Sequence, residues 1–374
     1  MLGHELCEGL IVMPQSMLRP DRDARLLLSC ERGFTLHCKR LVCVSAAAVL
    51  ASMATGVTAS AMAASLSGAG STLVAPLEAK WAAGFASTGN SVNYSAVGSG
   101  TGITDITDNL VDFGASDAPL TPAQQSGCPT CVQIPWALSA TAVGFHLKGV
   151  STLKLTGKVL SEIYLGQITN WDNSAIKKLN KGVRLPNKKI TPIHRTDGSG
   201  DTYAFTNYLY HVSSAWRSKV GPAATTVGFP GGIGGKGNSG VTAILANTNG
   251  SIGYVAASYL IEQGGLGAAE IQNAAGKYEY PNIPEISDAT KSVHSVPASN
   301  ALPIVDPPKS DKTAYPISTF TYVIVHKNTP KATLLTQWIT YALTTGQAFG
   351  AKLDFAPIPK VVLNAAKTTL AGLS

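Results

Sequence analysis

From Ser65 onward the sequence alternates short apolar segments with segments of helical pattern, and this alternation restricts the chain to a few architectures. Residues 91–97 are predicted to form a strand followed by a helix from Ile103, and residues 190–195 a strand followed by a helix from Gly200. Strands that alternate with helices are typical of α/β layers. The chain has 374 residues, which is enough for two domains. We therefore expect an α/β protein.

Three further segments complete this outline. Residues 132–147 are expected to be extended, with a break at Pro135, and residues 315–326 to form a later strand. Helices are expected around residues 156–165 and 172–180. No segment after the N-terminal region reaches the roughly 20 apolar residues that a membrane-spanning helix needs.

The net charge and the sequence motifs limit the functional classes to which the protein can belong. The formal net charge is +7, which suits an anionic ligand but is also compatible with an ordinary basic surface. No run of Lys and Arg with interleaved aromatic residues occurs, so no nucleic-acid partner is predicted. Residues 232–237 match G-x-G-x-x-G formally, but they follow Phe229-Pro230 instead of a strand, so we expect no nicotinamide site and no cofactor. The nucleotide-binding G-x-x-x-x-G-K-[ST] and hydrolase G-x-S-x-G motifs are absent from the sequence.

An export signal is predicted near the N-terminus. Lys39-Arg40 precedes an apolar segment that ends in Ala61-Met62-Ala63, and this order is typical of a signal peptide. The alternative, a membrane anchor, is disfavoured because the segment is rich in Ala, Ser and Thr. We expect residues 1–64 to be an N-terminal extension and signal, with cleavage near Ala63 or Ala64. The mature protein would lie on the periplasmic or extracellular side of the cell membrane.

The six cysteines fall into two groups. The body of the protein contains two, Cys128 and Cys131, in the sequence Cys-Pro-Thr-Cys. One pair is too few for a four-ligand zinc site, and the histidines of the body are scattered, so no metal site is predicted. In a reducing cytosol the pair would be a redox motif, whereas export favours a small disulfide loop. The others are Cys7, Cys30, Cys38 and Cys43.

Three loops share one pattern, in which Ser or Thr and Gly come immediately before a helix. They are residues 68–73, 98–102 and 197–202. Such a loop directs backbone N–H groups and hydroxyls outward at the positive end of the helix dipole, and Gly lets a ligand approach the backbone. Each loop alone is explained by N-capping. Three together, with Arg195 beside one of them, predict an oxyanion site.

Five longer segments extend this pattern over most of the body. In chain order they are GAGSTLVAPLEAKWA, VDFGASDAPLT, EIYLGQITNWDNSAIKKLN, HRTDGSGDTYAFTNYL and GGKGNSGV. Together they resemble the signature segments of the phosphate-specific periplasmic binding proteins of ABC transporters. The resemblance implies a two-lobed, type II periplasmic-binding fold whose lobes are crossed twice by the chain. Lobe I would comprise residues 65–146 and 314–374, and lobe II residues 147–313, with phosphate in the cleft between them.

The resemblance also implies the ligand-binding residues. Carried over position by position, they are the Thr72 hydroxyl, the Leu73 N–H, the Ser99 hydroxyl, Asp117 as acceptor of a ligand proton, Arg195 as a charged fork oriented by Asp197, the Ser199 hydroxyl, the Gly200 N–H and the Asp201 N–H. The family commonly has Phe in place of Leu73 and often Thr in place of Asp201. Asp supplies no hydroxyl, so either Thr202 replaces that donor or Asp201 faces away from the ligand.

The function implied is that of a monomeric binding protein. It would capture inorganic phosphate and deliver it to the membrane permease and ATPase subunits of a phosphate ABC transporter, without being an enzyme. The alternatives are a secreted phosphatase, a binder of another oxyanion, and a phosphate sensor or adhesin. Asp117 would favour phosphate, which carries a proton at neutral pH, over sulfate, which does not.

Overall fold

The computed structural model describes residues 64–261 and 265–374. Residues 1–63 of the predicted export signal, including Cys7, Cys30, Cys38 and Cys43, lie outside the described residues. Among the helices that are described, none is both long and apolar enough to span a bilayer.

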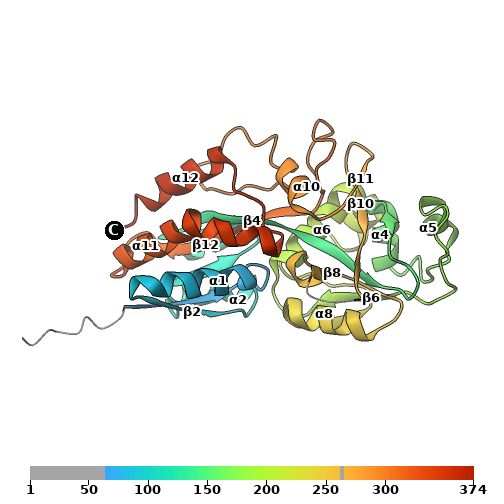
Figure 1. Ribbon diagram of the computed structural model, residues 1–374, viewed down its shortest axis with the longest axis horizontal. Helices are drawn as coiled ribbons and strands as arrows, with labels where there is room; N and C mark the ends of the chain where they lie inside the picture. Colours follow the sequence, from blue (N-terminus) through green and yellow to red (C-terminus); the bar gives the residue numbers. More distant parts are fainter. Residues whose placement is uncertain (1–63, 262–264) are drawn as a thin grey trace, which may run out of the picture. The chain divides into compact units, whose positions relative to one another are not determined.

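A nine-stranded sheet runs through the body (Figure 1). Its first part has the order β2–β1–β3–β12–β4. The bounds are β1 Ser65–Gly70, β2 Ser91–Ser95, β3 Phe113–Ser116, β4 Cys131–His146 and β12 Ser318–His326. Strand β1 is parallel to β2 and β3, whereas β12 is antiparallel to β3 and β4. We call this half of the sheet, with its helices, lobe I.

The sheet continues from β4 into a second half, which we call lobe II. The order there is β4–β8–β6–β7, and β9 also pairs with β4. The bounds are β6 Thr191–Arg195, β7 Ile233–Gly235, β8 Ser251–Ala256 and β9 Gly267–Ala268. Strand β6 is parallel to β7 and β8. A separate small sheet has the order β11–β10–β5, formed by β5 Lys154–Leu155, β10 Glu270–Gln272 and β11 Tyr278–Glu279.

Strand β4 carries the chain from one lobe to the other. Its residues 131–140 pair with β12, and residues 141–146 pair with β8. The chain returns beside this point, where Thr141 N donates to Ile317 O at 3.0 Å just before β12. Two lobes joined by two crossings are the predicted fold class, which is confirmed.

The break predicted at Pro135 is wrong, because β4 continues through it. The register with β12 shifts between Thr321 and Tyr322, opposite Pro135. Proline has no N–H to give to the ladder, and a local irregularity accommodates it without ending the strand. Strand β4 is buried along nearly its whole length, with 14 of its 16 residues buried and only Val132 and His146 partly exposed. This packing holds the strand together.

Helices cover the sheet in both lobes. Those of lobe I are α1 Ala75–Phe85, the short 3₁₀ helix η1 Ala86–Thr88, α2 Ser99–Thr107, α3 Pro122–Gly127, α11 Ala332–Leu343, η2 Thr345–Leu353 and α12 Lys360–Leu370. Those of lobe II are α4 Gly157–Tyr164, α5 Ser174–Leu179, α6 Gly200–Val212, α7 Ser214–Lys219, α8 Gly237–Asn247, α9 Ser258–Ile261 and α10 Ile283–Asp288. The helices predicted around residues 156–165 and 172–180 correspond to α4 and α5.

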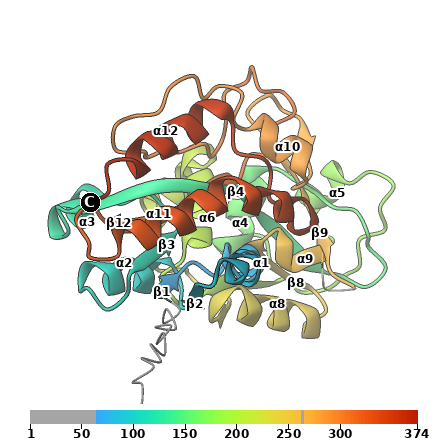
Figure 2. The same cartoon turned by 60° about the vertical axis from the view of Figure 1, so that its left-hand side comes forward.

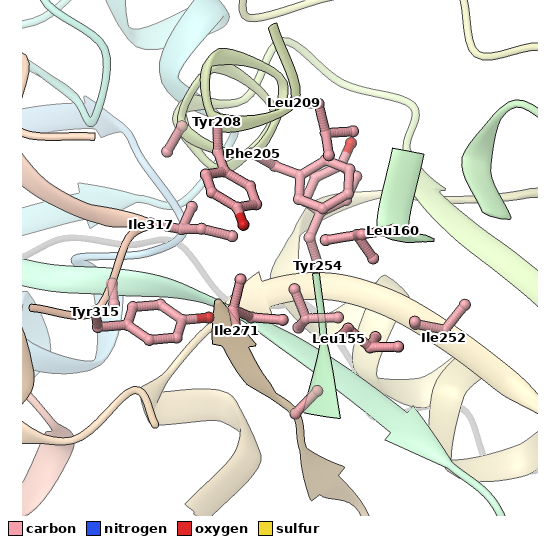
Figure 3. Packing of buried hydrophobic residues seen from close by; sticks show 14 of the residues in the cluster. Leu155, Leu160, Phe205, Tyr208, Leu209, Ile252, Tyr254, Ile271, Tyr315 and Ile317 are labelled. Carbon is pink, nitrogen blue, oxygen red and sulfur yellow. The ribbon is translucent and has the colours of Figure 1, made fainter. Parts of the chain in front are cut away.

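Each lobe has its own aromatic core. In lobe I, Trp81, Trp136 and Trp338 pack edge to face, with ring centroids 5.0–6.5 Å apart. Helices α1 and α11 meet there (Figure 2). The ring centroids of Phe85 and Trp338 are 5.2 Å apart. In lobe II, Phe205 of α6 stacks on Tyr254 of β8 at 4.5 Å (Figure 3). The two aromatic groups are distinct, but the buried cluster around Phe205 continues along β4 and β12 into lobe I, where it includes Leu138 and Phe320.

Candidate oxyanion-binding site

The carboxyl ends of parallel strands meet where the two lobes face each other. In lobe I, β1 leads into residues 71–74, and β3 is followed by Asp117. In lobe II, β6 ends at Arg195 and reaches α6 through residues 196–199. Loops at the carboxyl ends of parallel strands are common ligand sites in α/β proteins, because strand ends of the same direction share one edge. The predicted loops are therefore brought together by the topology.

Asp117 is a buried carboxylate surrounded by hydroxyls. Ser71 Oγ lies 2.6 Å from Asp117 Oδ1 and 2.7 Å from Oδ2, and Ser99 Oγ lies 3.3 Å from Oδ2. The side chain of Asp117 is withdrawn from solvent, with the residue 1% exposed. Ser71, which our sequence interpretation did not single out, therefore contacts the predicted proton acceptor more closely than Ser99 does.

This setting makes Asp117 difficult to ionise. Burial raises the pKa of its carboxyl to about 7, and the nearby charge of Asp201 adds to the rise. The hydrogen bond from Ser71, the charge of Arg195 and the hydrogen bond from Ser99 act in the opposite direction. Asp117 can therefore exchange a proton near neutral pH, which is the property required of a group that shares a proton with a ligand.

Arg195 is clamped by two carboxylates. Its Nε donates to Asp197 Oδ1 at 2.8 Å, its Nη2 to Asp197 Oδ2 at 2.5 Å and its Nη1 to Asp201 Oδ2 at 3.0 Å. Burial opposes its charge, but the hydrogen bonds that Arg195 donates to Asp197 and the two acidic charges outweigh burial and raise the pKa of Arg195. The same pairing lowers the pKa of Asp197, against the effect of its own burial. The guanidinium is thus fixed and permanently charged.

The carboxylate of Asp201 has a role that neither predicted alternative described. It accepts from Thr141 Oγ1 at 2.8 Å and from Asn238 Nδ2 at 2.7 Å, in addition to Arg195. The Thr202 hydroxyl, predicted as a replacement donor, lies 2.8 Å from the Tyr254 hydroxyl. Asp201 therefore belongs to the polar network around Arg195, and Thr202 stabilises the packing of α6 on β8.

Direct contacts join the two lobes at this site. Gly200 N donates to Ser99 Oγ at 3.1 Å, and Gly100 N donates to Gly198 O at 2.9 Å. Asn238 Nδ2 of lobe II donates to Thr72 Oγ1 of lobe I at 2.9 Å. The lobes are therefore closed on each other in this structure.

Glycine is required at one of these contacts. A Cβ at Gly200 would lie 2.4 Å from Asp117 Cβ, which is too short for two carbon atoms that are not bonded. Any larger residue at this position would hold the lobes apart. Gly200 therefore allows its own N–H to reach the centre of the site.

Of the loop hydroxyls, that of Ser199 caps a helix, whereas those of Ser99 and Thr72 do not. Ser199 is the N-cap of α6, and its Oγ accepts from Thr202 N at 3.3 Å, which leaves the hydroxyl proton for another acceptor. The N-caps of α2 and α1 are Gly98 and Val74, so neither Ser99 nor Thr72 occupies an N-cap position. N-capping thus explains one of the three loops.

The Leu73 N–H, predicted as a ligand donor, is engaged within its own loop. It donates to Ser71 Oγ at 3.0 Å, and the Leu73 side chain is fully buried. Cys128 and Cys131 lie elsewhere in lobe I, between α3 and β4, and their sulfurs are bonded to each other.

Comparisons with known proteins identify the family and the fold of this chain. The PBP superfamily domain matches residues 55–345. The Phosphate-binding protein PstS of Xylella fastidiosa is 36% identical over 304 residues, covering 79% of this chain and 81% of that protein. The crystal structure of a phosphate binding protein from Stenotrophomonas maltophilia covers 82% of this chain and 94% of that one, with 19% identity and a TM-score of 0.63. That of an ABC-type phosphate transport receptor from Vibrio cholerae covers 79% of this chain and 100% of that one, with 18% identity and a TM-score of 0.53. From its sequence relatives, its fold and the residues gathered between its lobes, this chain belongs to the PstS phosphate-binding protein family within the PBP superfamily.

Proposed function

We propose that this protein binds inorganic phosphate between its lobes and delivers it to the permease and ATPase subunits of a phosphate ABC transporter. The observation that carries the proposal is Asp117, a buried carboxylate held among hydroxyl and N–H donors at the closed interface of the lobes. The names of the relatives, a phosphate-binding protein and an ABC-type phosphate transport receptor, support the same assignment.

Dipoles would provide much of the attraction for the anion. The positive charge of Arg195 is already balanced by Asp197 and Asp201, so a simple excess of positive charge does not define the site. The N-terminal ends of α2 and α6 meet there, where Ser99 and Gly200 are hydrogen-bonded. Backbone N–H groups at helix N-termini hold an anion by hydrogen bonds without requiring a full opposite charge.

Asp117 would set the selectivity. Phosphate at neutral pH carries at least one proton, which it can donate to a carboxylate. Sulfate has no proton to donate, so one of its oxygens would face the carboxylate with no hydrogen between them. An unpaired buried contact of this kind costs on the order of 3 kcal/mol, which is enough to discriminate about 100-fold.

Binding would shift the lobes toward the closed arrangement. The ligand gains donors from both lobes only when they meet, so it stabilises the closed form over an open one. We place the bending point where the chain crosses between lobes, near Ala140 of β4 and Ile317 before β12. The assignment of residues 65–146 and 314–374 to lobe I, and 147–313 to lobe II, remains part of this proposal, as do export and a monomeric state.

Calorimetric titration of the purified protein with inorganic phosphate tests the proposal. We expect saturable binding of one phosphate per chain. Absence of heat and of any fluorescence change over millimolar phosphate would refute it. A colorimetric assay with phosphate monoesters addresses the competing phosphatase activity, for which we expect no release of phosphate above the buffer blank.

A further inference from the structure

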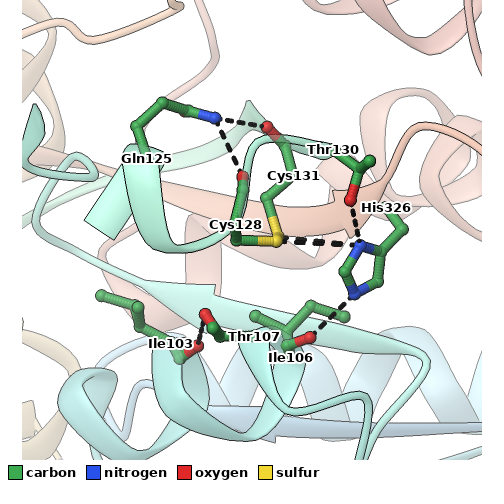
Figure 4. The surroundings of a disulfide bond; sticks show 8 residues. All are labelled: Ile103, Ile106, Thr107, Gln125, Cys128, Thr130, Cys131 and His326. Carbon is green, nitrogen blue, oxygen red and sulfur yellow. Dashed lines mark hydrogen bonds between the residues drawn. A yellow bond between two sulfur atoms is a disulfide. The ribbon is translucent and has the colours of Figure 1, made fainter. Parts of the chain in front are cut away.

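The corner of lobe I that holds Cys128 and Cys131 contains a third metal-binding side chain. His326, at the end of β12, places its Nδ1 3.7 Å from Cys128 Sγ and 4.0 Å from Cys131 Sγ (Figure 4). The donor atoms of the three residues all lie within 4.8 Å of one another. His326 is 195 residues away from Cys131, so the motif alone gave no indication of it.

Hydrogen bonds fix the imidazole in the form that binds metals. Nε2 of His326 lies 2.8 Å from Ile106 O, and a carbonyl only accepts, so Nε2 carries the ring proton. Nδ1 then accepts from the Thr130 hydroxyl at 2.8 Å, and the same side of the ring faces the two sulfurs. Metal-binding histidines in proteins are commonly oriented in this way, by a carbonyl or carboxylate on the second nitrogen.

The loop around the sulfurs is also fixed. Gln125 Nε2 donates to Cys128 O at 3.2 Å and to Cys131 O at 2.9 Å, and Cys131 N donates to Cys128 O at 3.0 Å. Both cysteines are buried, but a surface pocket of about 390 Å³ opens beside Cys131 and is also lined by Gln125 and Pro129. The site is therefore both ordered and reachable by a small ion.

We infer that Cys128, Cys131 and His326 form a Zn²⁺ site when the disulfide is reduced. Tetrahedral zinc with two thiolates and one imidazole places the nitrogen about 3.6 Å from each sulfur, close to the distances in this structure. The two sulfurs must separate, by rotation of the cysteine side chains, and the Thr130 hydroxyl must turn away from Nδ1. Two thiolates neutralise Zn²⁺, which suits a buried corner where a net charge would be costly. The fourth position, beside the Thr130 hydroxyl, would be open to water.

The conversion requires a dithiol reductant. One thiolate of the reductant attacks a cysteine sulfur, the S–S bond breaks, and the second thiol of the reductant expels the first cysteine thiol. The cysteine pair gains two electrons and two protons, and the reductant becomes a disulfide. Zn²⁺ then displaces the two thiol protons to solvent as it binds. The oxidised and metal-bound states therefore exclude each other.

A titration with Co²⁺, which gives zinc sites visible and near-ultraviolet absorption, tests the inference. Cys7, Cys30, Cys38 and Cys43 are replaced by Ser in every protein compared, so that only the pair in the body remains. After reduction by a phosphine, we expect one Co²⁺ per chain with a thiolate charge-transfer band, displaced by Zn²⁺. The oxidised protein should give no such band.

Two variants identify the ligands. His326→Gln retains a donor for Ile106 O but loses the ring nitrogen, and should weaken Co²⁺ binding at least about tenfold. Cys128→Ser should remove most of the charge-transfer band. His294→Ala, at an exposed histidine, is the control and should bind as the parent does. Failure of the reduced parent to bind Co²⁺, or parent-like affinity in His326→Gln, would overturn the assignment.

Discussion

The two ends of α2 lie in two polar clusters, which differ in their charge and in the lobes that form them. At the N-terminal end, Ser99 contacts Asp117 and receives a bond from Gly200 of the other lobe. At the C-terminal end, Ile106 O accepts from His326, which lies within lobe I. The first cluster contains an arginine and three aspartates and is completed only when the lobes meet, whereas the second contains no acidic or permanently charged side chain among its described members.

This difference indicates which of the two clusters is affected when a ligand moves the lobes. The charged cluster depends on contacts that cross the cleft, so a ligand that bridges the lobes changes its energy. The disulfide corner depends on contacts within one lobe, so closure should leave it unchanged. Substitutions in the two regions should therefore have separable effects on phosphate binding.

Arg195→Ala should weaken phosphate binding at least about 100-fold, because a buried anion site loses its cation and Asp197 and Asp201 are left unbalanced. Arg195→Lys should also bind weakly, since an ammonium group cannot hold both carboxylates as the planar fork does. Calorimetry measures both. Arg184→Ala, at an exposed arginine, is the matched control. An alanine variant that binds phosphate as the parent does would remove Arg195 from the site.

Sulfate binding should depend on pH through Asp117. The pKa of this carboxyl is raised to about 7, so lowering the pH through that value protonates it and allows it to donate to a bare sulfate oxygen. Sulfate affinity should therefore rise about tenfold between pH 8 and pH 6, because the protonated fraction rises by that factor. Sulfate is the better probe of Asp117, because phosphate itself changes its protonation in this pH range.

Asp117→Asn provides the control for this pH dependence. Its amide donates at every pH, so sulfate affinity should be higher than in the parent at pH 8 and nearly constant down to pH 6. If the parent shows the same flat profile as the variant, Asp117 does not titrate in the site.

Loss of the disulfide should have the smallest effect. The bonded cysteines are three positions apart, so the loop restrains the unfolded chain little, and we expect the double variant Cys128→Ser, Cys131→Ser to lose about 2 kcal/mol or less of unfolding free energy. Phosphate affinity should stay within about twofold of the parent, because no cross-cleft contact is altered. Urea unfolding and calorimetry measure the two quantities. A large loss of phosphate affinity would show that the two ends of α2 are coupled.

The sequence was most informative where residues act within one segment. The strand–helix alternation predicted the α/β layers, and the contiguous loops contained Ser99 and Gly200, with Arg195 beside one of them. Asp117 was indicated by the family resemblance. Partners that meet only through the fold were missed. Asn238 reaches Thr72 across 166 positions, and His326 reaches the cysteine pair from the opposite end of the chain. Their pairing depends on closure of the lobes or on the register of β12 with β4, and no local pattern encodes either.

Asp201 illustrates a different limit. A substitution of Asp where Thr is frequent indicates that a hydroxyl is lost, but not what the new carboxylate contacts. Its three donors, Thr141, Arg195 and Asn238, come from β4, β6 and α8. Only the assembled lobe shows that this buried charge is fully paired.

We expect Asp117 to make the interlobe site selective for a protonated oxyanion. A competition titration at pH 8 tests it most directly, with the purified protein held near half-saturation by phosphate while sulfate is added in increasing excess. We predict that sulfate at a tenfold excess displaces little phosphate, whereas arsenate, which also retains a proton at this pH, displaces it at comparable concentration. Displacement of phosphate by sulfate at comparable concentration would contradict the account.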